Sequence, residues 1–130
     1  MSLIMMVGKE FRFEAAHSLP HLPEGHKCRN LHGHSYRFRV DVCGPVDGRG
    51  FVMDYAEISR VVDPIVERLD HQNLNDIFAK ATTAENLADW LQKEIEDHLG
   101  RCDRIVLWET PTSVVVYENP RSEYLPRFVE

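Results

Sequence analysis

The sequence predicts an α+β domain in which one antiparallel four-stranded sheet carries two helices on a single face. Three observations lead to this fold class. Two segments near the start alternate apolar and polar residues, two central segments repeat apolar residues with a helical period, and two short strand-like segments follow. The predicted order is therefore strand, strand, helix, helix, strand, strand. At 130 residues, the chain is most simply a single domain, 1–130.

The first predicted strand spans residues 7–17. Phe11, Phe13 and His17 share one face, because side chains two residues apart in an extended chain point the same way. A lone histidine at the end of an apolar face is most simply a hydrogen-bonded core residue. The segment 18–30 contains prolines and a glycine among polar residues, which predicts a loop.

The second predicted strand spans residues 32–43 and begins with His32, Gly33 and His34. The two histidines share its apolar face. If the two strands form a long antiparallel hairpin, His17 at the end of the first strand meets both of them. Neutral imidazole is a favoured zinc ligand, and a catalytic zinc keeps three protein ligands and one open position. The pattern predicts a three-histidine zinc site.

The first predicted helix begins at Asp54, whose side chain can cap it, and continues to Leu69 along an apolar stripe. The polar pair Asp70 and His71 follows. The pattern alone is typical of a helix C-terminus with an imidazole placed on the helix dipole.

The second predicted helix starts at Thr82 or Thr83 and ends at residue 99. Two strands are predicted after it, at 104–110 and 113–117. Glu109 continues the apolar face of the first of these strands. A carboxylate there is costly unless it has a partner or leans into water.

Composition excludes several classes of protein. A net charge of −6 argues against a general binder of nucleic acid or of anionic membranes. No apolar segment approaches the roughly 20 residues that span a membrane. Three cysteines without a disulfide spacing indicate reduced thiols, so we expect a cytoplasmic protein. Residues 1–6 and the tail 119–130 contain no motif that indicates a function.

Several separate motifs, in chain order, resemble the 6-pyruvoyltetrahydropterin synthase family, which includes the 6-carboxytetrahydropterin synthases of the queuosine pathway. The likeness covers nearly the whole chain. It is carried by Phe-Glu-Ala-Ala-His17, Cys28-x-x-x-His32-Gly-His34, Asp54, Leu69-Asp-His71, Thr83-Ala-Glu-Asn86 and Trp108-Glu109-Thr110.

The resemblance implies a fold and a zinc site. The family's tunnelling fold, or T-fold, has the order of elements predicted above. The implied zinc ligands are His17, His32 and His34. The family assembles as a homohexamer of two stacked trimers, with sites at subunit boundaries. The charged face of the predicted sheet would then line the interior of the trimeric barrel; its residues are Arg12, Glu14, Arg37, Arg39 and Asp41.

The resemblance also implies catalytic and substrate-binding residues. Cys28 is the implied catalytic base, assisted by Asp70 and His71. Glu109 is the implied anchor of the pterin ring, with Thr83 nearby. The substrate's triphosphate has two basic candidates beside the thiol, Lys27 and Arg29.

The implied substrate is 7,8-dihydroneopterin triphosphate. In the carboxy-type branch the products are 6-carboxytetrahydropterin, acetaldehyde and triphosphate. In the pyruvoyl-type branch the carbon skeleton stays whole. The short spacing between Cys28 and His32 resembles the carboxy-type enzymes. A different alternative is a non-catalytic zinc domain in which Cys28 and the three histidines form a closed structural site.

Overall fold

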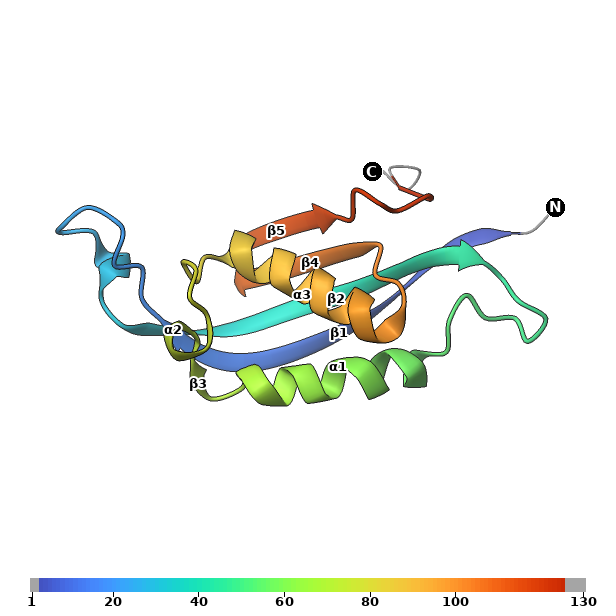
Figure 1. Ribbon diagram of the computed structural model, residues 1–130, viewed down its shortest axis with the longest axis horizontal. Helices are drawn as coiled ribbons and strands as arrows, with labels where there is room; N and C mark the ends of the chain where they lie inside the picture. The colour runs from blue at the N-terminus through green and yellow to red at the C-terminus, as the bar shows by residue number, and fades with distance from the viewer. Residues whose placement is uncertain (1–2, 126–130) are drawn as a thin grey trace.

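The computed structural model describes residues 3–125. The chain forms one layer of sheet and one layer of helices, with both long helices on the same side of the sheet (Figure 1). In chain order the elements are β1 (Ile4–His17), β2 (His32–Pro45), α1 (Tyr55–Leu69), β3 (Gln72–Asn73), α2 (Leu74–Ile77), α3 (Ala84–Leu99), β4 (Arg104–Thr110) and β5 (Ser113–Glu118). No helix among these is long and apolar enough to cross a membrane.

The sheet has five strands in the order β3-β1-β2-β4-β5, so the prediction of four strands was incomplete. The four long strands pair antiparallel, as predicted. The additional strand, β3, is parallel to β1 and only two residues long, and α2 follows it as a third helix. A two-residue strand has no period to detect. It forms because the chain leaving α1 runs along the free edge of β1, where Gln72 pairs with Ala15.

The longest feature of the sheet is the β1–β2 hairpin. The strands pair along their full length, from Ile4 with Pro45 to His17 with His32. Aromatic contacts fix this register, because the rings of Phe13 and Tyr36 stack with centroids 4.8 Å apart. The loop between the strands contains one 3₁₀ turn, Lys27–Arg29.

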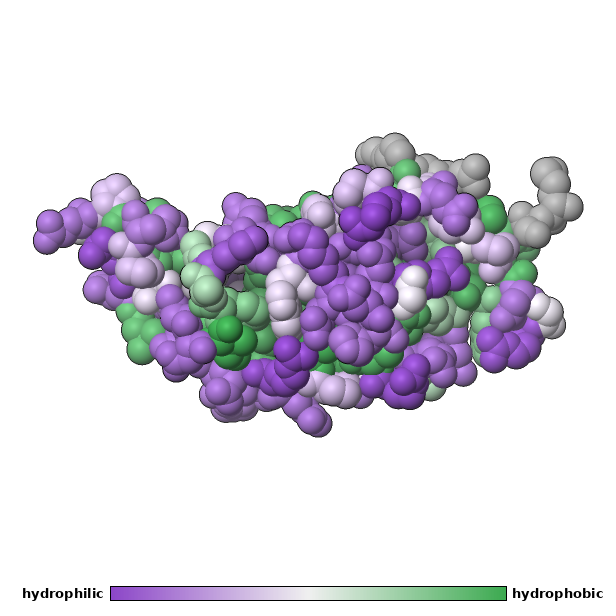
Figure 2. All heavy atoms as spheres, in the orientation of Figure 1, coloured by the Kyte–Doolittle hydropathy of each residue, from purple (hydrophilic) through white to green (hydrophobic). Residues whose placement is uncertain are grey.

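The core lies between the sheet and the two long helices. The buried face of β1 and β2 packs against the apolar stripe of α1, which was predicted from its period and is buried throughout: Ile58, Val61, Val62, Ile65 and Leu69. The outer surface on the helix side is mostly hydrophilic (Figure 2). The helices therefore cover one side of the sheet and expose their polar faces.

Side-chain caps set where the helices begin. Asp54 precedes α1 and accepts a hydrogen bond from the Ala56 amide. Thr83, and not Thr82, precedes α3, and its hydroxyl accepts a hydrogen bond from the Asn86 amide at 3.2 Å. Thr82 stays outside the helix and is buried, which releases it for a different contact described below.

The opposite face of the sheet is charged, as predicted, and its charges pair with one another. Asp41 accepts from the Nε atoms of Arg39 and Arg104, each at 2.8 Å, and is almost fully buried. Arg37 pairs with Glu10 at 2.8 Å. The attraction within these pairs offsets part of the free-energy cost of removing the charges from water.

Candidate metal centre and active site

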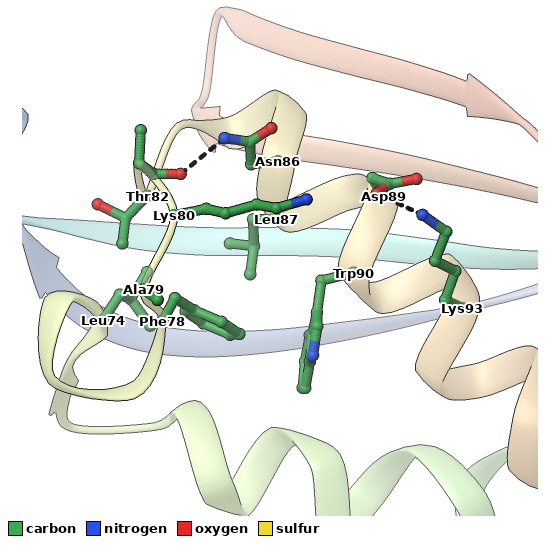
Figure 3. Close-up of a pocket in the computed structure, with 11 residues that line it drawn as sticks. Leu74, Phe78, Ala79, Lys80, Thr82, Asn86, Leu87, Asp89, Trp90 and Lys93 are labelled. Carbon is green, nitrogen blue, oxygen red and sulfur yellow. Dashed lines mark hydrogen bonds and ion pairs between the residues drawn. The ribbon is translucent and has the colours of Figure 1, made fainter.

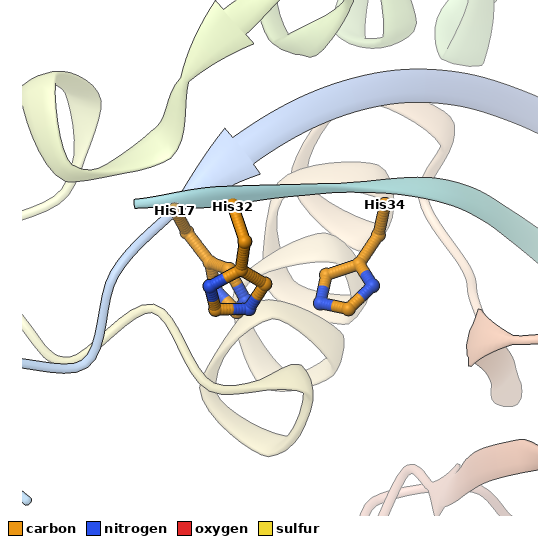
Figure 4. Close-up of side chains that lie close together, drawn as sticks. All are labelled: His17, His32 and His34. Carbon is orange, nitrogen blue, oxygen red and sulfur yellow. The ribbon is translucent and has the colours of Figure 1, made fainter. Parts of the chain in front are cut away.

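The end of β1 and the start of β2 bring three histidine side chains together. One ligand nitrogen from each of His17, His32 and His34 lies within 4.8 Å of the other two. Figure 4 shows the three rings hanging from the same side of the two strands. The hairpin register produces this arrangement, since His17 is the direct partner of His32 and His34 follows two residues later on the same face.

Backbone carbonyls fix the tautomers of two of these rings. The Nδ1 atom of His17 lies 2.7 Å from the Thr82 carbonyl oxygen, and that of His32 lies 2.7 Å from the Asn30 carbonyl oxygen. A carbonyl oxygen can only accept, so each Nδ1 must carry the proton and donate it. Each Nε2 atom is left with a free lone pair. Metal-binding histidines in proteins are oriented in this way.

The donor atoms fit a bound cation. The Nε2 atoms of His17 and His34 are buried, and neither has a hydrogen-bond partner within residues 3–125. Leaving a buried polar atom unpaired costs about 1–3 kcal/mol. Burial lowers the pKa of His34, the neighbouring His17 and His32 lower it further, and Glu109 opposes them. Neutral imidazole is the form that binds zinc, so the three nitrogens suit that ion.

Glu109 lies beside the histidine cluster. Its Oε2 atom lies 4.0 Å from the Nε2 atom of His17, and its Oε1 atom lies 3.9 Å from the Nε2 atom of His34. These distances are too long for hydrogen bonds. Glu109, which was predicted to continue the apolar face of its strand, therefore points toward the three histidines. Its oxygens remain available to a ligand there.

Cys28 lies on the 3₁₀ turn before β2 and is half-buried. Its thiol does not belong to the group of ligand atoms formed by the three histidines, so the described residues do not assemble a closed four-ligand site. This arrangement disfavours the structural-zinc alternative. It leaves the fourth position of the cluster open.

Arg29 holds the loop that carries Cys28. Its Nη1 atom donates to the carbonyl oxygens of Pro20 at 2.6 Å and Leu22 at 2.7 Å. The amide of Leu19 donates to the Cys28 carbonyl oxygen at 2.8 Å, which closes the base of the same loop. The guanidinium of Arg29, which was predicted to bind phosphate, is therefore hydrogen-bonded to the backbone of its own loop. The neighbouring Lys27 is exposed.

Asp70 and His71 form a pair at the end of α1. An Asp70 oxygen accepts from the Glu14 amide at 2.8 Å, and the other lies 3.0 Å from Nδ1 of His71. The Glu14 amide and the His71 imidazole together lower the pKa of Asp70. His71 has φ of 60°, a left-handed conformation that is uncommon outside glycine. Its amide donates to the Glu14 carbonyl oxygen at 2.6 Å, which holds this turn against β1.

The His71 imidazole opens onto a surface pocket of about 500 Å³ that Glu14, Gly33 and Ser35 also line. These three residues alternate with the ones that face the core, and His34 of the histidine cluster also lines the pocket. Within one chain, Cys28 forms no hydrogen bond with Asp70 or His71 among the described residues. The joint role of Cys28, Asp70 and His71 stays a prediction.

Three residues that the sequence did not single out support the cluster. Thr82 orients His17, and Asn75 holds the end of β1 by exchanging two hydrogen bonds of 2.9 Å with the Ser18 backbone. Tyr36 is buried two residues after His34. Asn75 could have been found in the polar segment that follows His71. The Thr82 contact uses a backbone carbonyl, which no sequence pattern reveals.

A separate pocket of about 240 Å³ lies between α3 and the segment that precedes it (Figure 3). Its apolar wall includes Phe78 and Trp90, whose rings meet edge to face, and Asp89 pairs with Lys93 at its edge. Thr82 lines it, but none of the predicted site residues does. The predicted chemistry therefore does not belong to this pocket.

Comparison with known proteins identifies the family. The sequence pattern of 6-pyruvoyl tetrahydropterin synthase matches residues 6–120. The chain belongs to this family. It is 40% identical over 124 residues to the 6-carboxy-5,6,7,8-tetrahydropterin synthase of Synechocystis, which covers 89% of the chain and 95% of that protein.

Two further relatives bear on fold and function. The chain is 38% identical over 100 residues to the dihydroneopterin monophosphate aldolase of Pyrococcus furiosus, covering 75% of the chain and 82% of the aldolase. The solved 6-pyruvoyl tetrahydropterin synthase of Caenorhabditis elegans matches with a TM-score of 0.83 at 25% identity, covering 91% and 97% of the two chains. The resemblance predicted from the motifs is confirmed, and the fold is the family's T-fold.

The geometry of the cluster predicts about one zinc ion per chain. Replacing His17 by Ala removes one of the three nitrogens, so that variant should lose most of its zinc after dialysis. Metal content should be measured by mass spectrometry on both proteins. His98→Ala is the matched control, because His98 is exposed on α3 and lies outside the cluster. Full zinc occupancy in His17→Ala would contradict the three-histidine site.

The loop contacts of Arg29 generate a second prediction. Arg29→Ala should loosen the loop that carries Cys28, so the Leu19 amide should exchange its hydrogen about 5- to 30-fold faster. Lys27→Ala should leave that exchange rate unchanged, because its ammonium does not hold the loop. Hydrogen–deuterium exchange read by NMR measures both. Equal rates in Arg29→Ala and wild type would show that the guanidinium does not hold the loop.

Proposed function

We propose that this protein is a zinc-dependent lyase that acts on 7,8-dihydroneopterin triphosphate. Its products would be 6-carboxytetrahydropterin, acetaldehyde and triphosphate, as in the queuosine pathway. The observation that carries the proposal is the convergence of three imidazole ring nitrogens beside the Glu109 carboxylate. The relatives support the product, since the Synechocystis protein bears the name 6-carboxytetrahydropterin synthase. The free cysteines agree with action in the cytoplasm.

His17, His32 and His34 would hold the zinc ion, which supplies a Lewis acid for the oxygens of the substrate side chain. The carbonyls of Thr82 and Asn30 keep the rings of His17 and His32 turned toward it. Residues 3–125 would supply three ligands, so a place is left for the substrate.

Glu109 would anchor the pterin ring. A carboxylate can accept two parallel hydrogen bonds, one from a ring N–H and one from the exocyclic amino group. Neither Glu109 oxygen is within hydrogen-bond distance of the histidines that it faces, so both can accept. Thr83 keeps a subsidiary role, because its oxygen already caps α3 and only its O–H remains to donate.

Cys28 would remove protons from the substrate side chain, with Asp70 and His71 assisting. Asp70 holds the Nδ1 atom of His71 and so leaves the Nε2 atom turned away from it to exchange protons. Glu14 and Ser35, which line the pocket beside His71, alternate with the core-facing residues of their strands, and we propose that His71 serves the site of a neighbouring subunit. The active site would then need two chains.

The carbon balance distinguishes the possible reactions. In the carboxy-type reaction, triphosphate is eliminated, water is added, and the bond between the first and second side-chain carbons breaks. The first carbon stays on the pterin as a carboxyl group, and the other two leave as acetaldehyde. Elimination without cleavage would give the pyruvoyl-type product. A second candidate is cleavage of a monophosphate substrate, which the name of the Pyrococcus relative raises. Lys27, and Arg29 if its guanidinium is released from the loop, would meet the phosphates.

The product tests the proposed activity directly. Zinc-loaded protein with dihydroneopterin triphosphate should give a pterin with a one-carbon carboxyl group and an equal amount of trapped acetaldehyde by mass spectrometry. Cys28→Ala should keep its zinc and lose at least about 100-fold in turnover, since a positioned base contributes 10²–10⁴-fold. A product with all three side-chain carbons would assign the pyruvoyl-type reaction. Turnover of the monophosphate alone would assign the aldolase activity.

The edges of the sheet support assembly into a hexamer. Val114 and Val116 on the edge strand β5 are 52% and 55% exposed, which is unfavourable in an isolated chain. Closing three sheets edge to edge would cover β5 and enclose the charged face. Light scattering at micromolar concentration should give a mass of about six 15.1 kDa chains. A mass of one chain would contradict both the assembly and the shared active site.

A further inference from the structure

Within residues 3–125, three buried side-chain nitrogen or oxygen atoms have no hydrogen-bond partner. They are the Nε2 atoms of His17 and His34 and the hydroxyl oxygen of Tyr36. A cation at the cluster accounts for the two nitrogens. It does not account for the phenol, which carries a proton at neutral pH and therefore needs an acceptor. Tyr36 is 1% exposed, so bulk water does not supply that acceptor.

Tyr36 belongs to the same enclosure as the histidines. It follows His34 by two residues on the same face of β2, and its ring centroid lies 5.5 Å from that of His34 and 6.3 Å from that of His17. Glu109 lies on the same cluster, because one of its carboxylate oxygens is 3.9 Å from the Nε2 atom of His34. The unpaired hydroxyl is therefore next to the candidate metal ligands and the candidate pterin anchor.

Packing explains the ring of Tyr36 but not its hydroxyl. The ring stacks on Phe13 at 4.8 Å, and the next residue on the same face of β2, Phe38, is fully buried without any polar atom. A phenylalanine would fill the same place in the core. Burying a hydroxyl without a partner costs free energy that phenylalanine would avoid. The hydroxyl is therefore best explained by a ligand.

We propose that the Tyr36 hydroxyl donates a hydrogen bond to an oxygen atom of the small molecule bound at the three-histidine site. This rests on the proposed function, in which that molecule carries adjacent oxygen atoms on its side chain. When a neighbouring C–H proton is removed, negative charge develops on such an oxygen. A buried neutral donor, already in position, stabilises that charge. Tyr36 is thus a further catalytic residue of the site.

Stability and metal content separate this role from a structural one. Tyr36→Phe should keep the zinc content of the wild type. Its metal-free form should melt at the same temperature or a few degrees higher, because the variant removes an unpaired buried hydroxyl. The matched control is Tyr117→Phe, whose hydroxyl helps to lower the pKa of Asp89, so that its removal should lower the melting temperature. Loss of zinc or a lower melting temperature in Tyr36→Phe would overturn the proposal.

Ligand binding tests the proposed contact without any turnover. Acetohydroxamate, a small chelator with two adjacent oxygens, should be titrated into the cobalt-substituted protein and followed by its visible spectrum. Its dissociation constant should rise about 5- to 20-fold in Tyr36→Phe and stay unchanged in Tyr117→Phe. Equal affinity in wild type and Tyr36→Phe would overturn the proposal.

Turnover of dihydroneopterin triphosphate is a separate readout. If the wild type does not turn over this substrate, the proposed function fails, while the hydroxamate titration still decides the role of Tyr36. If the wild type is active, Tyr36→Phe should lower kcat about 10-fold or more with a smaller change in KM. An unchanged kcat would overturn the catalytic role.

Discussion

The register of the β1–β2 hairpin is the constraint on which the rest of the site depends. Side chains alternate along a strand, so a slip of one residue would turn His32 and His34 to the opposite face of the sheet from His17. The stacked pairs of Phe11 with Phe38 and Phe13 with Tyr36 oppose such a slip, because it would break both stacks and expose the rings of Tyr36 and Phe38. The aromatic core and the histidine cluster are thus two consequences of one strand pairing.

The connections between the helices also hold the histidine cluster in place. The segment between α1 and α3 returns to the end of β1, where Asn75 binds the Ser18 backbone and the Thr82 carbonyl orients His17. These contacts hold a ligand in a single tautomer, and such supporting contacts are commonly worth 10–100-fold in metal affinity. The fold therefore supplies the ligands from the sheet and their orientation from the helix connections. His71 lines a pocket together with Glu14 and Ser35, which belong to the face of the sheet opposite the core.

The sequence was most informative for the elements in which apolar residues repeat with a regular period. Alternation predicted β1, β2 and the meeting of the three histidines, and the helical stripes predicted α1 and α3. It could not reveal β3, which is too short to show a period, or the Thr82 contact, which uses the backbone. Arg29 was predicted to bind phosphate because its positive charge can be read from the sequence. Its actual partners are two loop carbonyl oxygens, and these are near it only because of the path that the folded loop takes.

The central claim is that three imidazole nitrogens, and no sulfur, hold one metal ion with a position left open. X-ray absorption at the zinc edge of the loaded protein measures this most directly. The account predicts a first shell of only nitrogen and oxygen scatterers at about 2.0–2.1 Å, with the outer-shell pattern of three imidazoles. A sulfur scatterer at about 2.3 Å would place the Cys28 thiolate on the zinc, and the site would then be closed and structural.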